Sequence, residues 1–340
     1  VCSSDLLAQF ADLGMRHVGL LLDDIPWELQ YDDDRAAFDS VAQAHASLAT
    51  EVASRLWRRY PNLHLMVCPL VYCGIGDEPY IQLLGQSLHP RIDLMWTGRE
   101  ICSHRLDLVD AATFTRSAWR PPLYWDNYPV NDVAMVGELH LGPLQGRDRH
   151  LYRMSVGLVS NAMDRAEASK IPLATVGDYL WDPERYQPLE SWARAIREIA
   201  GPNDHQAFER FAETVQRSCL AGGGSPGMGE ACGQAGFLRA QGDVTGAQGV
   251  LVAHADLIEA TAAHLLSPGR DNPTLIAQCE PWIRRYREGA EALRALAGYL
   301  GGARSNVQAM AVIEDFRHSR RPQVFGDTIQ VFIDDLLAQG

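Results

Sequence analysis

Polar and aromatic residues follow five short apolar runs of the sequence, at the points where each run ends. In chain order they are Asp23-Asp24, Tyr72-Cys73-Gly74, Trp96-Thr97-Gly98, Trp125-Asp126-Asn127 and Ser160-Asn161. Carboxylates can transfer protons, aromatic rings can stack on a ligand, and amides can bind hydroxyl groups. Five such clusters in succession are hard to explain as solvent-exposed polar residues without a function, so they indicate a site for a polar ligand.

The pair Asp23-Asp24 directly follows the apolar run 19–22. Adjacent residues of a strand point to opposite sides, so these carboxylates cannot flank one bond face to face. They can act on neighbouring atoms of one substrate, one orienting a group while the other transfers a proton. That division suits glycoside hydrolysis in which the substrate's own acetamido group is the nucleophile. Taken alone, the pair is explained equally well by a helix cap or a loop salt bridge.

The segment 124–132 holds the densest set of ligand-binding side chains. It contains Trp125 and two acid–amide pairs, Asp126-Asn127 and Asn131-Asp132. The alternative is a turn-rich loop, because Asn, Asp and Pro are all turn formers. The aromatic ring beside two acid–amide pairs favours a polar ligand site.

The clusters are positioned by alternating strands and helices. Strands are expected at residues 17–22, 63–70, 92–96, 123–125 and 157–160. A long helix is expected between the first two, since apolar residues recur at helical spacing over 38–56. This alternation is typical of βα units around a parallel sheet, and the carboxyl ends of such strands form one face where active sites are built.

Near Leu189 the sequence pattern changes from alternating strands and helices to helices alone. An amphipathic pattern over 189–199 ends at Gly201-Pro202, a second follows over 208–215, and Gly222–Gly227 is expected to be a flexible connector. Three further helices are expected at 250–266, 274–300 and 306–317. We therefore expect two domains, a catalytic α/β domain over 1–187 and an all-α helical bundle over 188–340.

Composition excludes several classes of protein. With 30 basic and 43 acidic residues the formal net charge is −13, so nucleic acid is a poor partner. No apolar run approaches the ~18 residues of a membrane span. Seven irregularly spaced cysteines and eleven scattered histidines indicate neither a disulfide framework nor a metal site. Phosphate-binding, dinucleotide-binding and serine-hydrolase motifs do not occur, and no cofactor is expected.

Together, the motifs resemble glycoside hydrolase family 84, which contains O-GlcNAcases, bacterial β-N-acetylglucosaminidases and so-called hyaluronidases. They are Gly19–Ile25, Cys68-Pro69 with Tyr72–Gly74, Trp96–Gly98, Trp125–Asn127 with Asn131-Asp132, and Leu141–Pro143 with Gly146-Arg147. The resemblance covers about residues 1–185, and the tail resembles the helical bundle of bacterial members. It implies a (β/α)8 TIM-type barrel of which this chain holds the last five βα units. Three further strands, with a glycine and a lysine that contact the sugar, would precede Val1.

The resemblance also implies roles for individual residues. Asp23 would polarise the substrate's acetamido N–H, and Asp24 would be the general acid/base. Tyr72 would hold the acetamido oxygen near the anomeric carbon. The pocket for the acetamido methyl group would be lined by Cys68, Thr97, Ile101 and Trp125. The sugar's hydroxyl groups would be bound by Asn127, Asp132 and Asn161. No metal or organic cofactor is implied.

The leading hypothesis is therefore retaining hydrolysis of terminal β-linked N-acetylglucosamine from a glycoprotein or glycan, through an oxazoline intermediate. An alternative is a catalytically silent sugar-binding or interaction protein derived from such an enzyme. A third is a metal-dependent hydrolase, because Asp23-Asp24 and Asp132 are carboxylates that can hold Mg²⁺. The resemblance leans towards a secreted bacterial enzyme.

Overall fold

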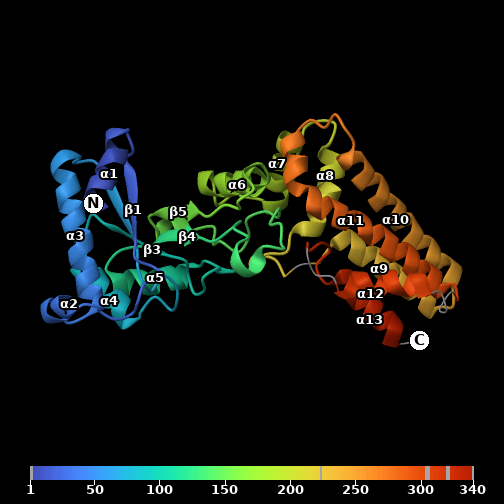
Figure 1. Cartoon of the computed structure of the whole chain (residues 1–340), viewed down its shortest axis with the longest axis horizontal. Helices are drawn as coiled ribbons and strands as arrows, with labels where there is room; N and C mark the ends of the chain where they lie inside the picture. The colour runs from blue at the N-terminus through green and yellow to red at the C-terminus, as the bar shows by residue number, and fades with distance from the viewer. Residues whose placement is uncertain (1–2, 223, 303–306, 319–321, 339–340) are drawn as a thin grey trace. The chain divides into compact units, whose positions relative to one another are not determined.

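The chain folds into two compact units, seen in the computed structural model in Figure 1. The structure describes residues 3–222, 224–302, 307–318 and 322–338. The first unit comprises Val1–Asn127 and Gly146–Asn161, and the second comprises Tyr128–Gln145 and Ala162–Gly340. Residues 128–145, which lie between the last two strands of the first unit, thus belong to the second.

The first unit is built on a parallel five-stranded sheet in the order β1-β2-β3-β4-β5, which appears in blue to green in Figure 1. The strands are β1 (His17–Leu21), β2 (His64–Cys68), β3 (Asp93–Trp96), β4 (Leu123–Asp126) and β5 (Gly157–Ser160). The pairing places Leu21 opposite Cys68 and Asp126 opposite Ser160. All five strands lie where the sequence predicts them, and their carboxyl ends carry the five clusters.

Helices cover one face of this sheet. They are α1 (Ser3–Asp12), α3 (Val41–Arg59), α4 (Pro79–Ser87) and α5 (Leu108–Ala118), whereas the short helix α2 (Asp32–Ala37) has no buried residue. The long helix α3 begins where the Ser40 hydroxyl accepts a hydrogen bond from the Gln43 N–H at 3.3 Å. Its buried face is rich in alanine, which lets the helix approach Leu65 and Val67 of β2 within one apolar core.

A smaller apolar cluster contains Cys68, Met95 and Leu123 from three adjacent strands. Tyr72 and Trp125 pack against it. Because successive side chains of a strand alternate between its faces, these residues cannot share the helix-covered face with Leu65 and Val67. The cluster therefore forms the apolar part of the sheet face on which the predicted site residues gather.

The expectation of five βα units holds in part. An α-helix follows β1, β2, β3 and β5, whereas only two 3₁₀ turns, η1 (Val133–Met135) and η2 (Leu151–Arg153), separate β4 from β5. This connection is held by specific polar contacts and by Leu139 and Leu141, which are buried in the core of the second unit. Because these contacts anchor the connection, it does not require the α-helix that the pattern of the other strands predicts.

Among its described residues the second unit consists of α-helices, short bridges, 3₁₀ turns and the irregular segment 128–145. Its helices are α6 (Ala166–Trp181), α7 (Pro188–Ala200), α8 (His205–Ala212), α9 (Pro226–Ala240), α10 (Val244–Leu266), α11 (Pro273–Leu300), α12 (Val307–His318) and α13 (Thr328–Ala338), with the 3₁₀ turn η3 (Glu213–Val215). One apolar core runs through it and includes Ile171, Trp282 and Leu293. The expected boundary between residues 187 and 188 stays a prediction.

The expected flexible connector at Gly222–Gly227 is wrong at its end, because α9 begins at Pro226. Four glycines weaken the helical signal of this segment, at 227, 229, 233 and 236. Its first turn is held by contacts that compensate: the Ser225 hydroxyl caps Met228, and the Gly227 N–H donates to Glu213 at 2.7 Å. Tertiary contacts thus form a helix that local propensity does not predict.

One helix of the described residues, α10, is long and apolar enough to span a membrane by length and composition alone. A core helix of a folded domain passes the same test, and Leu251, Ala255 and Ile258 of α10 are buried in the core of the second unit. The helix packs against α9 and α11.

Candidate active site

The two carboxylates follow β1 in a turn of the backbone. The Leu22 N–H donates to the Cys68 carbonyl at 2.9 Å, which extends the β1–β2 pairing to the residue before Asp23. Asp23 is half-buried and Asp24 is exposed. Asp24 has a φ of 53°, a left-handed conformation in which Asp and Asn are the residues other than glycine found most often.

Cys68 and Tyr72 lie in the field of these carboxylates. Burial is the main cause that raises the pKa of the Cys68 thiol to about 12, and the charges of Asp23 and Asp24 add to the shift. The Cys68 thiol also hydrogen-bonds with Asp23. Burial likewise raises the pKa of the Tyr72 phenol, with a further contribution from Asp24. At neutral pH both side chains are therefore uncharged donors beside two acidic groups.

Tyr72 is fixed to the cluster that follows β3. The Thr97 N–H donates to the Tyr72 carbonyl at 2.8 Å, and the Gly74 N–H donates to the Gly98 carbonyl at 3.0 Å. The Thr97 hydroxyl donates to the Glu100 carbonyl at 2.6 Å, which keeps this buried side chain satisfied. The segments after β2 and β3 are thus joined by backbone hydrogen bonds.

Asn127 connects the remaining predicted residues of the first unit. Its Oδ1 accepts hydrogen bonds from Trp125 Nε1 at 2.9 Å and from Asn161 Nδ2 at 3.0 Å. Its Nδ2 donates to the Ile101 carbonyl at 2.7 Å. These contacts tie the ends of β4 and β5 to the loop after β3. A side chain held by three partners keeps a single orientation, which suits an amide that binds a ligand.

A buried ion pair lies directly beside this network. Asp126 and Arg147 have side chains that are only 3% and 1% exposed, and Arg147 Nε donates to Asp126 Oδ2 at 2.8 Å while Nη2 donates to Oδ1 at 2.5 Å. Arg147 Nη1 also donates to the His104 carbonyl at 3.2 Å. Arg147 therefore connects the end of β4 to the loop after β3, as the hydrogen bond between Asn127 and Ile101 also does. In the sequence, the position of Arg147 directly after Gly146 is the one feature that marks it. Spacing alone does not reveal that its partner is Asp126.

Nine of the ten predicted site residues lie in the first unit, at the carboxyl ends of the strands. The contacts above link them into one set; they are Asp23, Asp24, Cys68, Tyr72, Thr97, Ile101, Trp125, Asn127 and Asn161. The tenth, Asp132, belongs to the second unit, where it is exposed and directly precedes the 3₁₀ turn η1. Its role stays a prediction.

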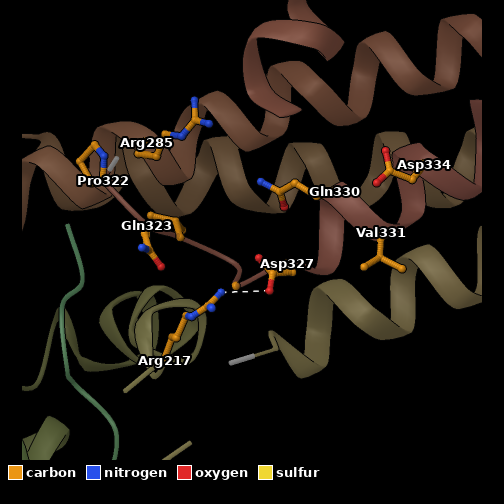
Figure 2. Close-up of a pocket in the computed structure, with 10 residues that line it drawn as sticks. Arg217, Arg285, Pro322, Gln323, Asp327, Gln330, Val331 and Asp334 are labelled. Atoms are coloured by element: carbon orange, nitrogen blue, oxygen red, sulfur yellow. Dashed lines mark hydrogen bonds and ion pairs between the residues drawn. The ribbon is translucent and has the colours of Figure 1, made fainter. Parts of the chain in front are cut away.

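No group of three or more His, Cys, Asp or Glu side chains able to hold a metal ion occurs among the described residues. A cavity of about 390 Å³ lies in the second unit and is lined by none of the ten predicted residues. Figure 2 shows two of its charged groups paired with each other, because Arg217 donates to Asp327 at 3.0 Å. A third, Arg285, donates to Glu288 at 2.7 Å, so these three charged groups are compensated within the protein.

Comparisons with known proteins show which family this chain is similar to. A family model described as beta-N-acetylglucosaminidase matches residues 5–213. Protein O-GlcNAcase of Rattus norvegicus and of Mus musculus are each 30% identical over 179 residues, covering 51% of this chain and 19% of the relative. The chain therefore spans about a fifth of the length of these relatives.

Solved structures extend the similarity over nearly the whole chain. An O-GlcNAc hydrolase mutant from Thermobaculum terrenum matches with a TM-score of 0.89 and 27% identity, covering 98% of this chain and 73% of that one. CpGH84B matches with a TM-score of 0.79 over 98% of this chain and 59% of that one, at 21% identity, and shows a shared fold. With strand-end carboxylates, an α/β fold and a family model matching more than half of it, this chain belongs to the β-N-acetylglucosaminidase family, glycoside hydrolase family 84.

Proposed function

We propose that this protein hydrolyses terminal β-linked N-acetylglucosamine, with retention of configuration and with the substrate's acetamido group as the nucleophile. The observation that carries the proposal is the set formed by Asp23, Asp24, Cys68 and Tyr72 at the ends of β1 and β2. Two carboxylates stand there beside an uncharged thiol and an uncharged phenol. Such a set can polarise an amide, position its oxygen and transfer a proton within one small region.

In the first step the acetamido carbonyl oxygen attacks the anomeric carbon, and the bond from that carbon to the leaving oxygen breaks. Asp23 accepts the hydrogen bond of the acetamido N–H, which makes the carbonyl oxygen more nucleophilic. The Tyr72 phenol donates to that oxygen and holds it near the anomeric carbon. Asp24, protonated in this step, gives its proton to the leaving oxygen.

In the second step water opens the protonated oxazoline (oxazolinium ion) that the first step formed, whose N–H stays hydrogen-bonded to the Asp23 carboxylate. Asp24, now a carboxylate, removes a proton from the water while the water oxygen bonds to the anomeric carbon. The bond between the anomeric carbon and the acetamido oxygen breaks, and the acetamido group is restored. Two successive inversions leave the configuration unchanged, and Asp24 ends the cycle protonated, as it began.

The sugar itself is recognised by the residues around this set. Cys68 belongs to the apolar cluster at the strand ends and Trp125 packs against it. Together with Thr97 and Ile101 they would receive the acetamido methyl group. Asn127, Asn161 and Asp132 would bind the hydroxyl groups. The relatives named O-GlcNAcase and O-GlcNAc hydrolase point to a glycoprotein carrying N-acetylglucosamine as the substrate class.

The test is a comparison of two fluorogenic substrates that differ only at carbon 2. We expect hydrolysis of the aryl β-N-acetylglucosaminide and no measurable hydrolysis of the aryl β-glucoside, because the glucoside lacks the internal nucleophile. Equal rates on both substrates, or a preference for the glucoside, would exclude the mechanism. Binding of an N-acetylglucosamine-thiazoline inhibitor without turnover of either substrate would instead identify a sugar-binding protein. Retention of activity in EDTA would exclude the hypothesis that the protein is a metal-dependent hydrolase.

A further inference from the structure

A histidine that the proposed mechanism does not use is completely buried in the loop that carries Asp132. The side chain of His140 is 0% exposed. Its Nδ1 lies 3.1 Å from the Pro129 carbonyl oxygen, and its Nε2 lies 2.7 Å from Glu138 Oε2. The imidazole ring therefore lies between the beginning and the end of one loop.

Both neighbours of the ring are acceptors. A carbonyl oxygen cannot donate, and an ionised carboxylate accepts only. Each ring nitrogen thus faces one acceptor at hydrogen-bond distance, and buried polar groups are held by such contacts. The ring connects the Pro129 carbonyl at the start of the loop to the Glu138 carboxylate near its end.

The loop around the histidine is closed by three further contacts. The Tyr128 ring is nearly parallel to the His140 ring, with an interplanar angle of 13° and centroids 6.2 Å apart. The Tyr128 hydroxyl donates to the Gly142 carbonyl at 2.5 Å. Asn131 Nδ2 donates to the Glu138 carbonyl at 2.8 Å. Asp132 follows Asn131 directly, so its backbone is anchored on one side by this set of buried contacts.

We propose that His140 is a positioning residue that acts through Asp132: its ring, held between the Pro129 carbonyl and the Glu138 carboxylate, fixes the loop 128–140 so that Asp132 is presented in one conformation. The inference rests on the proposed function in one respect, the binding of the sugar by Asp132. The fixation of the loop is a property of the second unit alone.

The first experiment compares hydrogen exchange in the wild type, His140→Phe and Glu138→Gln. His140→Phe keeps a planar ring against Tyr128 and removes both ring nitrogens, whereas Glu138→Gln keeps an acceptor of the same shape and removes the carboxylate. We expect exchange in peptides covering 131–139 to become about tenfold faster in both variants, with α10 and α11 unchanged. His264→Phe is the matched control, since His264 Nε2 also pairs with a carboxylate, Asp204, at 2.9 Å. Exchange over 131–139 that does not change would overturn the proposal.

The second experiment separates positioning from general stabilisation. kcat/KM for the aryl β-N-acetylglucosaminide is measured for His140→Phe, Asp132→Ala and the double variant. If His140 acts through Asp132, its substitution costs about tenfold alone and little in the Asp132→Ala background, as coupled residues do. Additive losses would overturn the positioning role.

The two experiments fail in different ways. A wild type that does not hydrolyse the substrate contradicts the proposed function, while the exchange comparison still decides whether His140 holds the loop. A wild type that is active, with unchanged exchange or additive losses, contradicts only the inference about His140.

Discussion

At the residue scale, the two acidic side chains of the candidate site differ in environment although they are adjacent in sequence. Asp23 is half-buried and hydrogen-bonds with the Cys68 thiol, whereas Asp24 is exposed and has a left-handed backbone conformation. One carboxylate is thus held in place, and the other is open to a substrate and to water. This difference matches the division between an orienting group and an acid/base.

Asp24→Asn tests the acid/base role with little risk to folding, because Asn also tolerates the left-handed conformation. We expect kcat/KM to fall by about 10²–10⁴ for a glycoside with a poor leaving group, since proton transfer contributes that much. For a dinitrophenyl glycoside, whose leaving group needs no proton, kcat/KM should stay near the wild-type value. Equal losses on both substrates would assign Asp24 a different role.

Cys68 offers a chemical probe of the same region. Because burial and the neighbouring carboxylates raise its pKa to about 12, the thiol is protonated at pH 8 in the folded protein. Iodoacetamide reacts with thiolates, so alkylation of Cys68 should be far slower than in the chain unfolded in urea, where thiols have a pKa of about 8.5. The rate should rise with pH up to about 12. Mass spectrometry of the peptide that contains Cys68 measures it, and equal rates in folded and unfolded chains would contradict this environment.

At the scale of elements, the candidate site depends on loops that hydrogen bonds join across the strand ends. The loop after β3 meets the segment before β5 in a short parallel pairing of Leu106 with Arg147, and Gly146 makes this possible. The φ of Gly146 is 73°, and a Cβ there would lie 2.2 Å from the His104 carbonyl oxygen. The glycine thus places Arg147 within reach of Asp126.

Arg147→Met is expected to destabilise the first unit by about 3–5 kcal/mol, because it leaves the Asp126 carboxylate buried without its partner. The same variant should lower kcat/KM. Without Arg147, the end of β4 and the loop after β3 lose one of their connections, and the hydrogen bond between Asn127 and Ile101 remains. Urea unfolding and initial rates measure the two effects. Arg149→Met is the matched control, as Arg149 is exposed two residues further along the chain. A loss of stability equal to that of the control would show that the ion pair contributes nothing.

The sequence predicts these elements unequally. The five strands and most long helices are predicted because their apolar residues recur with a clear period, as in α3 and α11. The helix α9 is not predicted, because four glycines conceal it and contacts from Glu213 and Ser225 stabilise its first turn. In the sequence Arg147 is identified only as part of the motif Gly146-Arg147, since its pairing with Asp126 spans 21 positions and depends on the fold. The carboxylates and aromatic residues were identifiable because they follow the strands directly.

At the scale of the whole molecule, each compact unit has one large apolar core among its described residues. The first contains Leu65 and packs helices on a parallel sheet, and the second contains Leu293 and packs helices on helices. Each compact unit is held mainly by its own core, so the chain should not unfold as a single two-state system.

Calorimetry should therefore resolve two transitions, which core substitutions shift separately. Leu65→Ala and Leu293→Ala each remove a fully buried side chain and should each cost about 2–5 kcal/mol in one unit. We expect each substitution to lower the midpoint of one transition and leave the other unchanged. A single transition that both substitutions shift equally would show that the two units unfold together.

The central claim is that the substrate's acetamido group is the nucleophile, and one measurement tests it most directly. Aryl β-glucosaminides carrying N-acetyl, N-fluoroacetyl, N-difluoroacetyl and N-trifluoroacetyl groups differ in the nucleophilicity of the carbonyl oxygen and little in shape. We predict that kcat/KM falls progressively as fluorine atoms are added, because the attacking oxygen loses electron density. A kcat/KM that does not depend on fluorination would contradict the account, since the anomeric carbon would then be attacked by another group.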